Sequence, residues 1–244
     1  MKKRADLLLV EKKIAESRTK AQAIIMAGQI YINEKKILKS GELIDEKSII
    51  TFKNLHPQWV SRGAFKILHA LDHFKIDVKN LRCMDLGAST GGFTEVLLSK
   101  GALKIYSVDV GSNQLHEKLQ KSDRVVNMSK TNARYLAKEL IPEVIDIIVC
   151  DVSFISMKKV IKPSLIFLDK KFGTIIALIK PQFESDRNEI KRGGVITNPL
   201  IHKRICDEYI DWFKNICNMK VLGITPSPIT GPKGNVEFLI CAKR

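Results

Sequence analysis

Charged residues end or interrupt apolar stretches at three places in the second half of the chain. Asp151 follows the run 145–150, Lys180 follows the run 174–179, and Glu237 interrupts the apolar stretch 236–242. A carboxylate or an ammonium group is costly to bury unless it is paired. The three residues are therefore predicted either to form structural ion pairs or to belong to a site in which amines and carboxylates move protons.

A glycine-rich turn is predicted between a strand and a helix in the stretch 83–97. An apolar strand that ends in Asp85 leads into Gly87, Gly91 and Gly92, and an amphipathic helix follows. Glycine lets the backbone turn with positive φ and lets a ligand approach closely. The next strand ends in Asp109, from where a carboxylate can accept hydrogen bonds from ribose hydroxyls. The alternative is a tight turn with a capping acid and no ligand.

The spacing of these glycines distinguishes between two candidate nucleoside cofactors. A dinucleotide fingerprint has the pattern Gly-x-Gly-x-x-Gly, whereas this chain has Asp-Leu followed by Gly-x-x-x-Gly-Gly. The pattern resembles the first motif of S-adenosylmethionine-dependent methyltransferases, in which the turn meets the methionine end of the cofactor. We therefore expect S-adenosyl-L-methionine, and an NAD-dependent enzyme is disfavoured.

The chain from residue 82 onward predicts the scaffold that positions these residues. Strands are expected at 82–86, 104–109, 124–128, 145–150, 172–179, 219–225 and 236–242, and helices at 91–100, 114–121, 133–139, 156–169 and 199–216. The apolar strands favour a parallel sheet covered on both faces, and the last two strands should pair antiparallel. This α/β arrangement resembles the Rossmann-like, seven-stranded class I methyltransferase fold. Ligands bind such sheets at the carboxyl ends of the strands, where Asp85, Asp109, Asp151 and Lys180 are expected.

The part of the chain before residue 61 is predicted to form a small α+β unit. Helices are expected from Ala5 and over 18–27, and strands at 29–33 and 49–52. Residues 1–55 are predicted to be an RNA-binding module, 56–60 a linker and 61–244 the methyltransferase domain. The second domain should open with a helix that Ser61 caps and that buries Phe65, Leu68 and Leu71.

Composition narrows the class of protein. The 244 residues carry 41 Lys+Arg against 26 Asp+Glu, a net charge of +15 that raises the odds of a polyanionic partner. The five cysteines include no Cys-x-x-Cys pair, so we expect reduced thiols and neither disulfides nor a metal site. No stretch reads as a signal peptide or a membrane span. We expect a cytoplasmic protein that does not enter membranes and is a monomer in solution.

The stretch 17–33, Ser-Arg-Thr-Lys followed by an apolar helix, a glycine and an Asn-ended strand, resembles the small RNA-binding module named after a ribosomal small-subunit protein. In that module paired helices and a short hairpin present basic residues to structured RNA. Arg4, Arg18 and Lys20 are the predicted RNA contacts; the alternative is a solvated basic helical hairpin.

Five motifs in order extend the resemblance to nearly the whole chain. They are Ser-Arg-Gly-Ala-Phe-Lys66, Asp-Leu-Gly-Ala-Ser-Thr-Gly-Gly-Phe-Thr94, Asp-Val-Ser-Phe154, Lys-Pro-Gln-Phe-Glu184 and Gly-Asn-Val-Glu-Phe238. Together they resemble the TlyA family, also called haemolysin A, of ribosomal-RNA ribose 2′-O-methyltransferases related to the FtsJ type. One departure is Pro57, which stands where the linker of the family usually carries Arg.

The resemblance implies a set of site residues. The catalytic Lys-Asp-Lys-Glu set of the family falls on Lys66, Asp151, Lys180 and Glu237. Cofactor contacts are expected from Gly87, Ser89, Gly91, Gly92, Phe93, Asp109, Asn132 and Asp151. Asn132 replaces an acid of the FtsJ-type relatives. The hypothesis is that Lys180 takes the proton of the ribose 2′-hydroxyl beside Lys66, while the two acids hold the lysines.

Substrate and alternatives follow from the same resemblance. The family modifies cytidines in ribosomal RNA, always in the large subunit and in longer members also in the small one, so this chain is expected to act on 23S rRNA and less so on 16S. A membrane-active haemolysin and a non-catalytic ribosome-binding factor are the competing classes. The absence of a long basic amphipathic helix disfavours the first, and the retained catalytic set disfavours the second.

Overall fold

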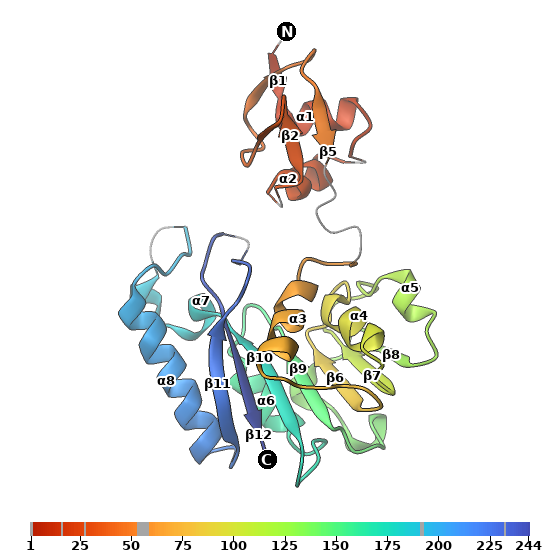
Figure 1. Ribbon diagram of the computed structural model, residues 1–244, viewed down its shortest axis with the longest axis vertical. Coiled ribbons are helices and arrows are strands. Elements are labelled where there is room, and N and C mark those ends of the chain that lie inside the picture. Colours follow the sequence, from red (N-terminus) through yellow and green to blue (C-terminus); the bar gives the residue numbers. More distant parts are fainter. Residues whose placement is uncertain (1, 16, 27, 53–58, 191–192, 232) are drawn as a thin grey trace. The chain divides into compact units, whose positions relative to one another are not determined.

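The computed structural model describes residues 2–15, 17–26, 28–52, 59–190, 193–231 and 233–244 (Figure 1). The chain divides into two compact units, Met1–Gln58 and Trp59–Arg244. Residues 56–58 of the expected linker lie outside the described residues. Trp59 and Val60 pack against the hydrophobic core of the second unit, so the chain is already part of that unit at residue 59.

The first unit packs two helices against short antiparallel strands. Its elements are β1 (Lys2–Arg4), α1 (Ala5–Glu11), α2 (Arg18–Met26), β2 (Ile30–Ile32), β3 (Lys35–Lys36), β4 (Leu43–Asp45) and β5 (Ile50–Phe52). β1 pairs with β4, and β2 lies between β3 and β5. Leu8, Leu9, Ile25 and Ile30 are fully buried at its centre. Both expected helices and both expected strands are present; β1, β3 and β4 are too short to leave a periodic signal.

A seven-stranded sheet forms the middle of the second unit. Its strands are β6 (Arg82–Leu86), β7 (Lys104–Val108), β8 (Val125–Met128), β9 (Ile147–Cys150), β10 (Thr174–Ile179), β11 (Lys220–Pro226) and β12 (Phe238–Lys243). They lie in the order β11-β12-β10-β9-β6-β7-β8. β12 runs antiparallel to both of its neighbours, and the pairings among β8, β7, β6, β9 and β10 are parallel. The predicted α/β arrangement is confirmed.

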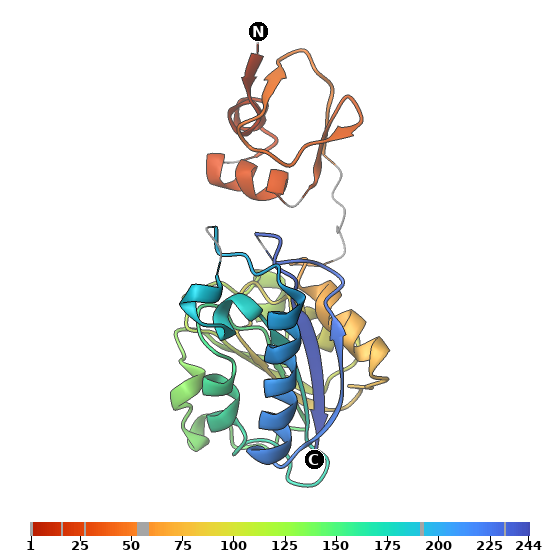
Figure 2. The ribbon, with the colours of Figure 1, turned by 90° about the vertical axis from the view of Figure 1, so that its left-hand side faces the viewer.

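Helices cover both faces of this sheet. They are α3 (Ala64–His73), α4 (Gly92–Ser99), α5 (Glu117–Gln120), α6 (Lys158–Ser164), α7 (Pro181–Glu184) and α8 (Pro199–Asn215), with 3-10 turns η1 (Ala133–Tyr135), η2 (Lys138–Leu140) and η3 (Arg187–Glu189). Successive strand residues point to opposite faces: Ile147 and Val149 join the core beneath α3 and α4, and Ile148 joins the core beneath α6 and α8. Figure 2 shows α3 in orange on one side of the sheet and the green segment with α6 on the other.

Several predicted helices are shorter than expected. The expected helix 114–121 is reduced to α5, whose first turn the His116 side chain caps. The expected helix 133–139 is replaced by η1 and η2. In α3 the buried positions are Ala64, Lys66, Ile67, Ala70 and Leu71. Phe65 and Leu68 are only partly buried, so the predicted face was wrong by about one position. Ser61 does not cap α3, because its hydroxyl accepts from Gly63 N in the turn before the helix.

Candidate active site

The glycine turn after β6 is built as the sequence predicts. Gly87 has φ +83°, and a Cβ at this position would lie 2.7 Å from the carbonyl oxygen of Asp151. Gly91 has φ +97° and precedes the first residue of α4. Both positions need the left-handed region that glycine adopts without strain. The close approach of Gly87 to Asp151 places the end of β9 directly beside the turn.

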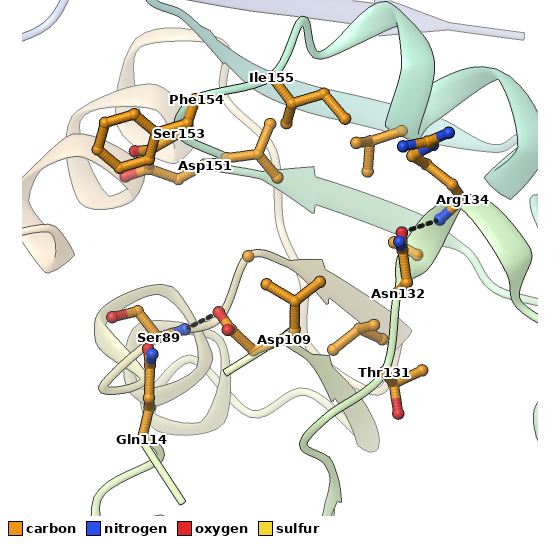
Figure 3. Close-up of a pocket in the computed structure, with 16 residues that line it drawn as sticks. Ser89, Asp109, Gln114, Thr131, Asn132, Arg134, Asp151, Ser153, Phe154 and Ile155 are labelled. Carbon is orange, nitrogen blue, oxygen red and sulfur yellow. Dashed lines mark hydrogen bonds between the residues drawn. The ribbon is translucent and has the colours of Figure 1, made fainter. Parts of the chain in front are cut away.

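A cavity of about 490 Å³ lies over this turn (Figure 3). Five predicted cofactor residues line it: Gly87, Ser89, Asp109, Asn132 and Asp151. Asp109 accepts hydrogen bonds from Ser89 N at 2.8 Å and from Gly111 N at 2.7 Å. The backbone thus fixes the Asp109 carboxylate at the carboxyl end of β7, where a ribose can be bound.

The walls of this cavity differ in character. Figure 3 shows Asp109 with Ser89 on one side and Phe154 with Ile155 on the other. Asn132 accepts a hydrogen bond from Arg134 N at 3.1 Å and so caps η1. Phe154 is almost fully exposed and has φ +65°, a conformation that is an outlier for a bulky residue. Strained backbone of this kind clusters at functional sites.

A second cavity, of about 220 Å³, adjoins the first. Gly87, Ser89, Asp151 and Ser153 line both cavities. The second cavity is also lined by the remaining members of the predicted catalytic set and two more residues of the glycine turn: Lys66, Lys180, Glu237, Gly92 and Phe93. A ligand in the first cavity therefore borders directly on the charged cluster in the second.

The four charged residues form one connected cluster. Lys66 Nζ lies 2.8 Å from Glu237 Oε2 and 3.3 Å from Asp151 Oδ2. Lys180 Nζ lies 2.5 Å from Asp151 Oδ1. Asp151 therefore bridges the two lysines, and two positive charges are balanced by two negative ones.

Sheet topology explains why residues so distant in sequence meet. Ile179 of β10 pairs with Phe238 of β12, so Lys180 and Glu237, the next residues outward, are neighbours at the same edge. Cys150 of β9 pairs with Ala177 of β10, which brings Asp151 to that edge as well. α3 crosses the face of the sheet with Ile67 in the core and delivers Lys66 from above.

The electrostatics of Asp151 follow from this arrangement. Burial opposes its ionisation, but the ammonium groups of Lys66 and Lys180 outweigh burial, so the pKa of the Asp151 carboxyl lies below its ordinary value. Asp151 is thus held as a carboxylate between two cations. This is the state in which it can orient both amines.

Asp85 does not lie at a ligand-binding strand end, contrary to expectation. It lies inside β6 and is fully buried. Its carboxyl accepts a hydrogen bond from the Thr94 hydroxyl at 2.7 Å. Burial raises the pKa of Asp85 to about 7, and the charge of Asp151 adds to the effect. Asp85 therefore ties β6 to α4 beneath the glycine turn.

Gly91 lines neither cavity. A Cβ at this position would collide with Leu115 and Leu119, so Gly91 shapes the turn from behind. The position needs a small residue with positive φ, which is the signal that the sequence pattern detects. The glycine pattern in the sequence does not distinguish a glycine that faces a ligand from one that faces the core.

Ser153 is a member of the cluster that the sequence analysis missed. Its hydroxyl accepts a hydrogen bond from Lys180 Nζ at 2.8 Å, and it lines both cavities. Serine is common in loops after strands, so its type carries no signal. The only sequence feature that points to Ser153 is its position, two residues after Asp151 in the exposed turn.

Two of the three predicted RNA contacts in the first unit, Arg4 and Arg18, share one acid. Asp6 is fully buried and accepts from Arg4 Nη2 at 2.9 Å, Arg18 Nε at 3.0 Å and Gln22 Nε2 at 2.9 Å. The hydrogen bond from Arg4, together with those from Gln22 and Arg18, holds the pKa of Asp6 well below its usual range despite burial. The side chain of the third predicted contact, Lys20, lies outside the described ones.

Within the described ranges, no group of three or more His, Cys, Asp or Glu is placed to hold a metal ion. No helix of the described chain is both long enough and apolar enough to cross a membrane.

Comparison with known families agrees with this geometry. Residues 59–244 match the FtsJ-like methyltransferase model, and residues 3–50 match the S4 domain. The chain therefore belongs to the FtsJ-like methyltransferase family and carries an S4 domain ahead of it. The resemblance seen in the five motifs is confirmed.

Individual relatives match over most of their length. The chain is 37% identical to the 16S/23S rRNA (cytidine-2′-O)-methyltransferase TlyA of Mycobacterium tuberculosis, over 97% of this chain and 88% of the relative. It is 34% identical to the 23S rRNA (cytidine-2′-O)-methyltransferase TlyA of Campylobacter jejuni, over 94% and 95%. A solved structure that bears the name hemolysin, from Streptococcus thermophilus, is 36% identical with a TM-score of 0.77, over 100% of this chain and 88% of that one.

Proposed function

We propose that this protein transfers a methyl group from S-adenosyl-L-methionine to the ribose 2′-hydroxyl of a cytidine in ribosomal RNA. The observation that carries the proposal is the cluster of Lys66, Asp151, Lys180 and Glu237 beside the cavity over the glycine turn. The two relatives named above share 23S rRNA in their names, so 23S rRNA is the proposed substrate.

The first cavity fits the cofactor. Gly87 has no Cβ, which lets the end of β9 at Asp151 pack directly against the turn that lines the cavity. Asp109 presents a fixed carboxylate for ribose hydroxyls, and Asn132 is the candidate contact for the adenine. When bound, S-adenosyl-L-methionine supplies a methyl group that its sulfonium already makes a good electrophile.

The chemistry left to the protein is to orient the ribose hydroxyl and to remove its proton. We assign the proton acceptor to Lys180, which lines the second cavity and is held by Asp151 and Ser153. A lysine accepts a proton only in its neutral form, so the form of Lys180 that acts as the acceptor is the free amine. Lys66, which shares Asp151 with Lys180, is the cation placed to stabilise the oxyanion that develops on the ribose. Glu237 fixes Lys66 from the other side.

Substrate binding is assigned to two places. The S4 domain offers Arg4 and Arg18, and the chain as a whole carries a net charge of +15 that favours a polyanion. At the cavity, the exposed ring of Phe154 gives a face on which a base can stack.

The test is methyl transfer from labelled cofactor to large ribosomal subunits and to 23S rRNA from cells that lack this gene. The modified nucleotide is then mapped. Lys180→Ala should abolish transfer and leave cofactor affinity unchanged, while Lys171→Ala, an exposed lysine away from both cavities, serves as the matched control. Transfer retained by Lys180→Ala would overturn the role of the lysine. Failure of the wild-type protein to methylate any ribosomal RNA would overturn the proposed function.

A further inference from the structure

A third hollow, of about 370 Å³, lies between η1, α6 and α8 on the face of the sheet away from α3. It is called the α6 groove here. Its lining includes four cations and two aromatic rings: Arg134, Lys158, Lys159, Lys162, Tyr135 and Trp212. The lining contains no acid. A concave surface with cations and aromatic faces and no negative charge suits a ligand that carries both phosphates and bases.

Two cations that line the α6 groove lie against aromatic rings, one of them, Tyr135, in the groove itself and the other, Tyr209, buried beside it. The Arg134 guanidinium lies 4.9 Å from the centre of the Tyr135 ring, and Arg134 Nη2 donates to the Tyr135 hydroxyl at 2.7 Å. Lys158 Nζ lies 4.6 Å from the centre of the Tyr209 ring. These contacts hold two side chains that would otherwise be mobile. Tyr135 nevertheless remains 71% exposed, so its ring is accessible to a base.

The lysines of the α6 groove have no acid partner. Among the ion pairs between described residues, none involves Lys158, Lys159 or Lys162. Elsewhere on the surface, lysines such as Lys121 and Lys203 do pair with acids one helical turn away. Unpaired, clustered ammonium groups are the feature by which proteins bind phosphates.

The α6 groove adjoins the proposed cofactor cavity. Arg134 lines both. Asn132, which caps η1, faces the cavity, and Tyr135 at the end of η1 faces the groove. The groove and the proposed cofactor cavity are therefore neighbours on either side of η1, within the same unit.

We propose that the α6 groove binds a single-stranded segment of the RNA substrate, with phosphates on Lys159 and Lys162 and a base on Tyr135. The inference rests on the proposed function and adds to it a second RNA contact, within the methyltransferase domain. It predicts that this unit contributes affinity for unpaired RNA in addition to that of the S4 domain. A folded duplex would not offer its bases to Tyr135.

The first experiment reverses charge in the full-length protein. Lys159→Glu with Lys162→Glu is compared with Lys170→Glu with Lys171→Glu, a pair of exposed lysines outside the groove that gives the same change in net charge. Affinity is measured for a mixed-sequence single-stranded oligoribonucleotide and for unmodified 23S rRNA over a range of salt. The groove pair should weaken binding about tenfold or more and lower the salt slope by about 1.4, since single strands contribute about 0.7 per phosphate. The control pair should change the slope much less.

The second experiment tests stacking. Tyr135→Ala should weaken binding of the single strand by about fivefold or more, whereas Tyr135→Phe, which keeps the ring, should bind nearly as well as wild type. The methylation rate at saturating RNA should stay unchanged in both, with the loss confined to KM. Equal binding by the groove and control pairs, or equal loss in the Ala and Phe variants, would overturn the inference. Wild-type protein that binds the oligoribonucleotide but methylates no ribosomal RNA would instead count against the proposed function.

Discussion

Each unit of this molecule contains an acid that bridges two cations, and the surroundings of the cations differ. Asp6 holds Arg4 and Arg18, whose side chains remain 41% and 54% exposed. Asp151 holds Lys66 and Lys180, whose side chains are only 8% and 9% exposed. Arginine keeps its charge at any ordinary pH, whereas lysine can lose its proton when its environment favours the neutral form. The bridge at Asp6 thus presents permanent charge to solvent, whereas the bridge at Asp151 encloses the lysine that we propose as the proton acceptor.

The largest expected effect comes from replacing a lysine held by Asp151 with arginine, the type of residue that Asp6 holds. Lys180→Arg keeps a cation beside Asp151 but removes a group that can accept a proton. We expect methyl transfer to fall by about a hundredfold or more, the scale of general-base catalysis. Cofactor affinity, measured by calorimetry, should be unchanged. Near-normal activity in this variant would mean that Lys180 acts only as a charge.

The next largest effect should be a loss of stability when the buried bridge at Asp151 is broken. Asp151→Asn leaves two lysines with one acid between them, and loss of one partner of a buried pair costs about 3 kcal/mol. Asp207→Asn, in the exposed pair with Lys203, should cost far less. Urea unfolding of both variants compares the two.

The stabilising effect of Asp151 has a defined pH range. Its pKa is lowered in the folded state, relative to about 3.9 in an unfolded chain. Its contribution is therefore present above about pH 4 and lost as the pH falls below that value. The difference between wild type and Asp151→Asn should shrink on acidification. A difference that grows in acid would contradict the ion-pair account.

Breaking the exposed bridge should affect binding more than chemistry. Asp6→Asn releases Arg4 and Arg18 from a fixed orientation, so RNA affinity should fall by about tenfold, the scale of about 1.4 kcal/mol. The rate at saturating RNA should be unchanged. Glu11→Gln, in the exposed pair with Lys3, is the control. Protease resistance of the first unit checks that it stays folded. Unchanged RNA affinity in a folded Asp6→Asn protein would contradict the prediction.

The last prediction concerns Asp85, an acid that forms no ion pair with another described residue. Its pKa is raised to about 7 by burial, above about 3.9 in an unfolded chain. The contribution to stability is full below about pH 4 and is lost as the pH rises through about 7. Wild type should therefore lose more stability than Asp85→Asn as the pH rises from about 4 to about 7, the window between these two pKa values. Parallel stability profiles would show that Asp85 does not titrate in this range.

Much of the site could be predicted from charged residues that interrupt or directly follow apolar stretches of the sequence. Asp151, Lys180 and Glu237 interrupt or end strands, and strand ends of one sheet meet at one edge. Lys66 could be assigned only through family resemblance, because a lysine on a helix is usually a solvated neighbour. Its burial depends on how α3 is rotated, and the predicted face, with Phe65 and Leu68 inward, was wrong by about one position.

Other features depend on contacts that no local pattern encodes. Asp85 and Asp109 stand in similar sequence settings, yet one is buried against Thr94 and the other lines the cavity. Ser153 joins the cluster only because the turn after β9 folds back toward Lys180. The lysines of α6 stand out only once Asp207 and Glu208 of α8 are seen to pair with Lys203 and Arg204 of their own helix.

The late position of β12 in the sequence has a consequence for how the enzyme folds during its synthesis. Glu237 precedes the last strand of the sheet, and it neutralises an amine that was synthesised some 170 residues earlier. A growing polypeptide that has not reached residue 237 lacks the acid that holds Lys66 from this side. Domains generally fold as units, so the ion-paired site is complete only after the final hairpin of the sheet has been made.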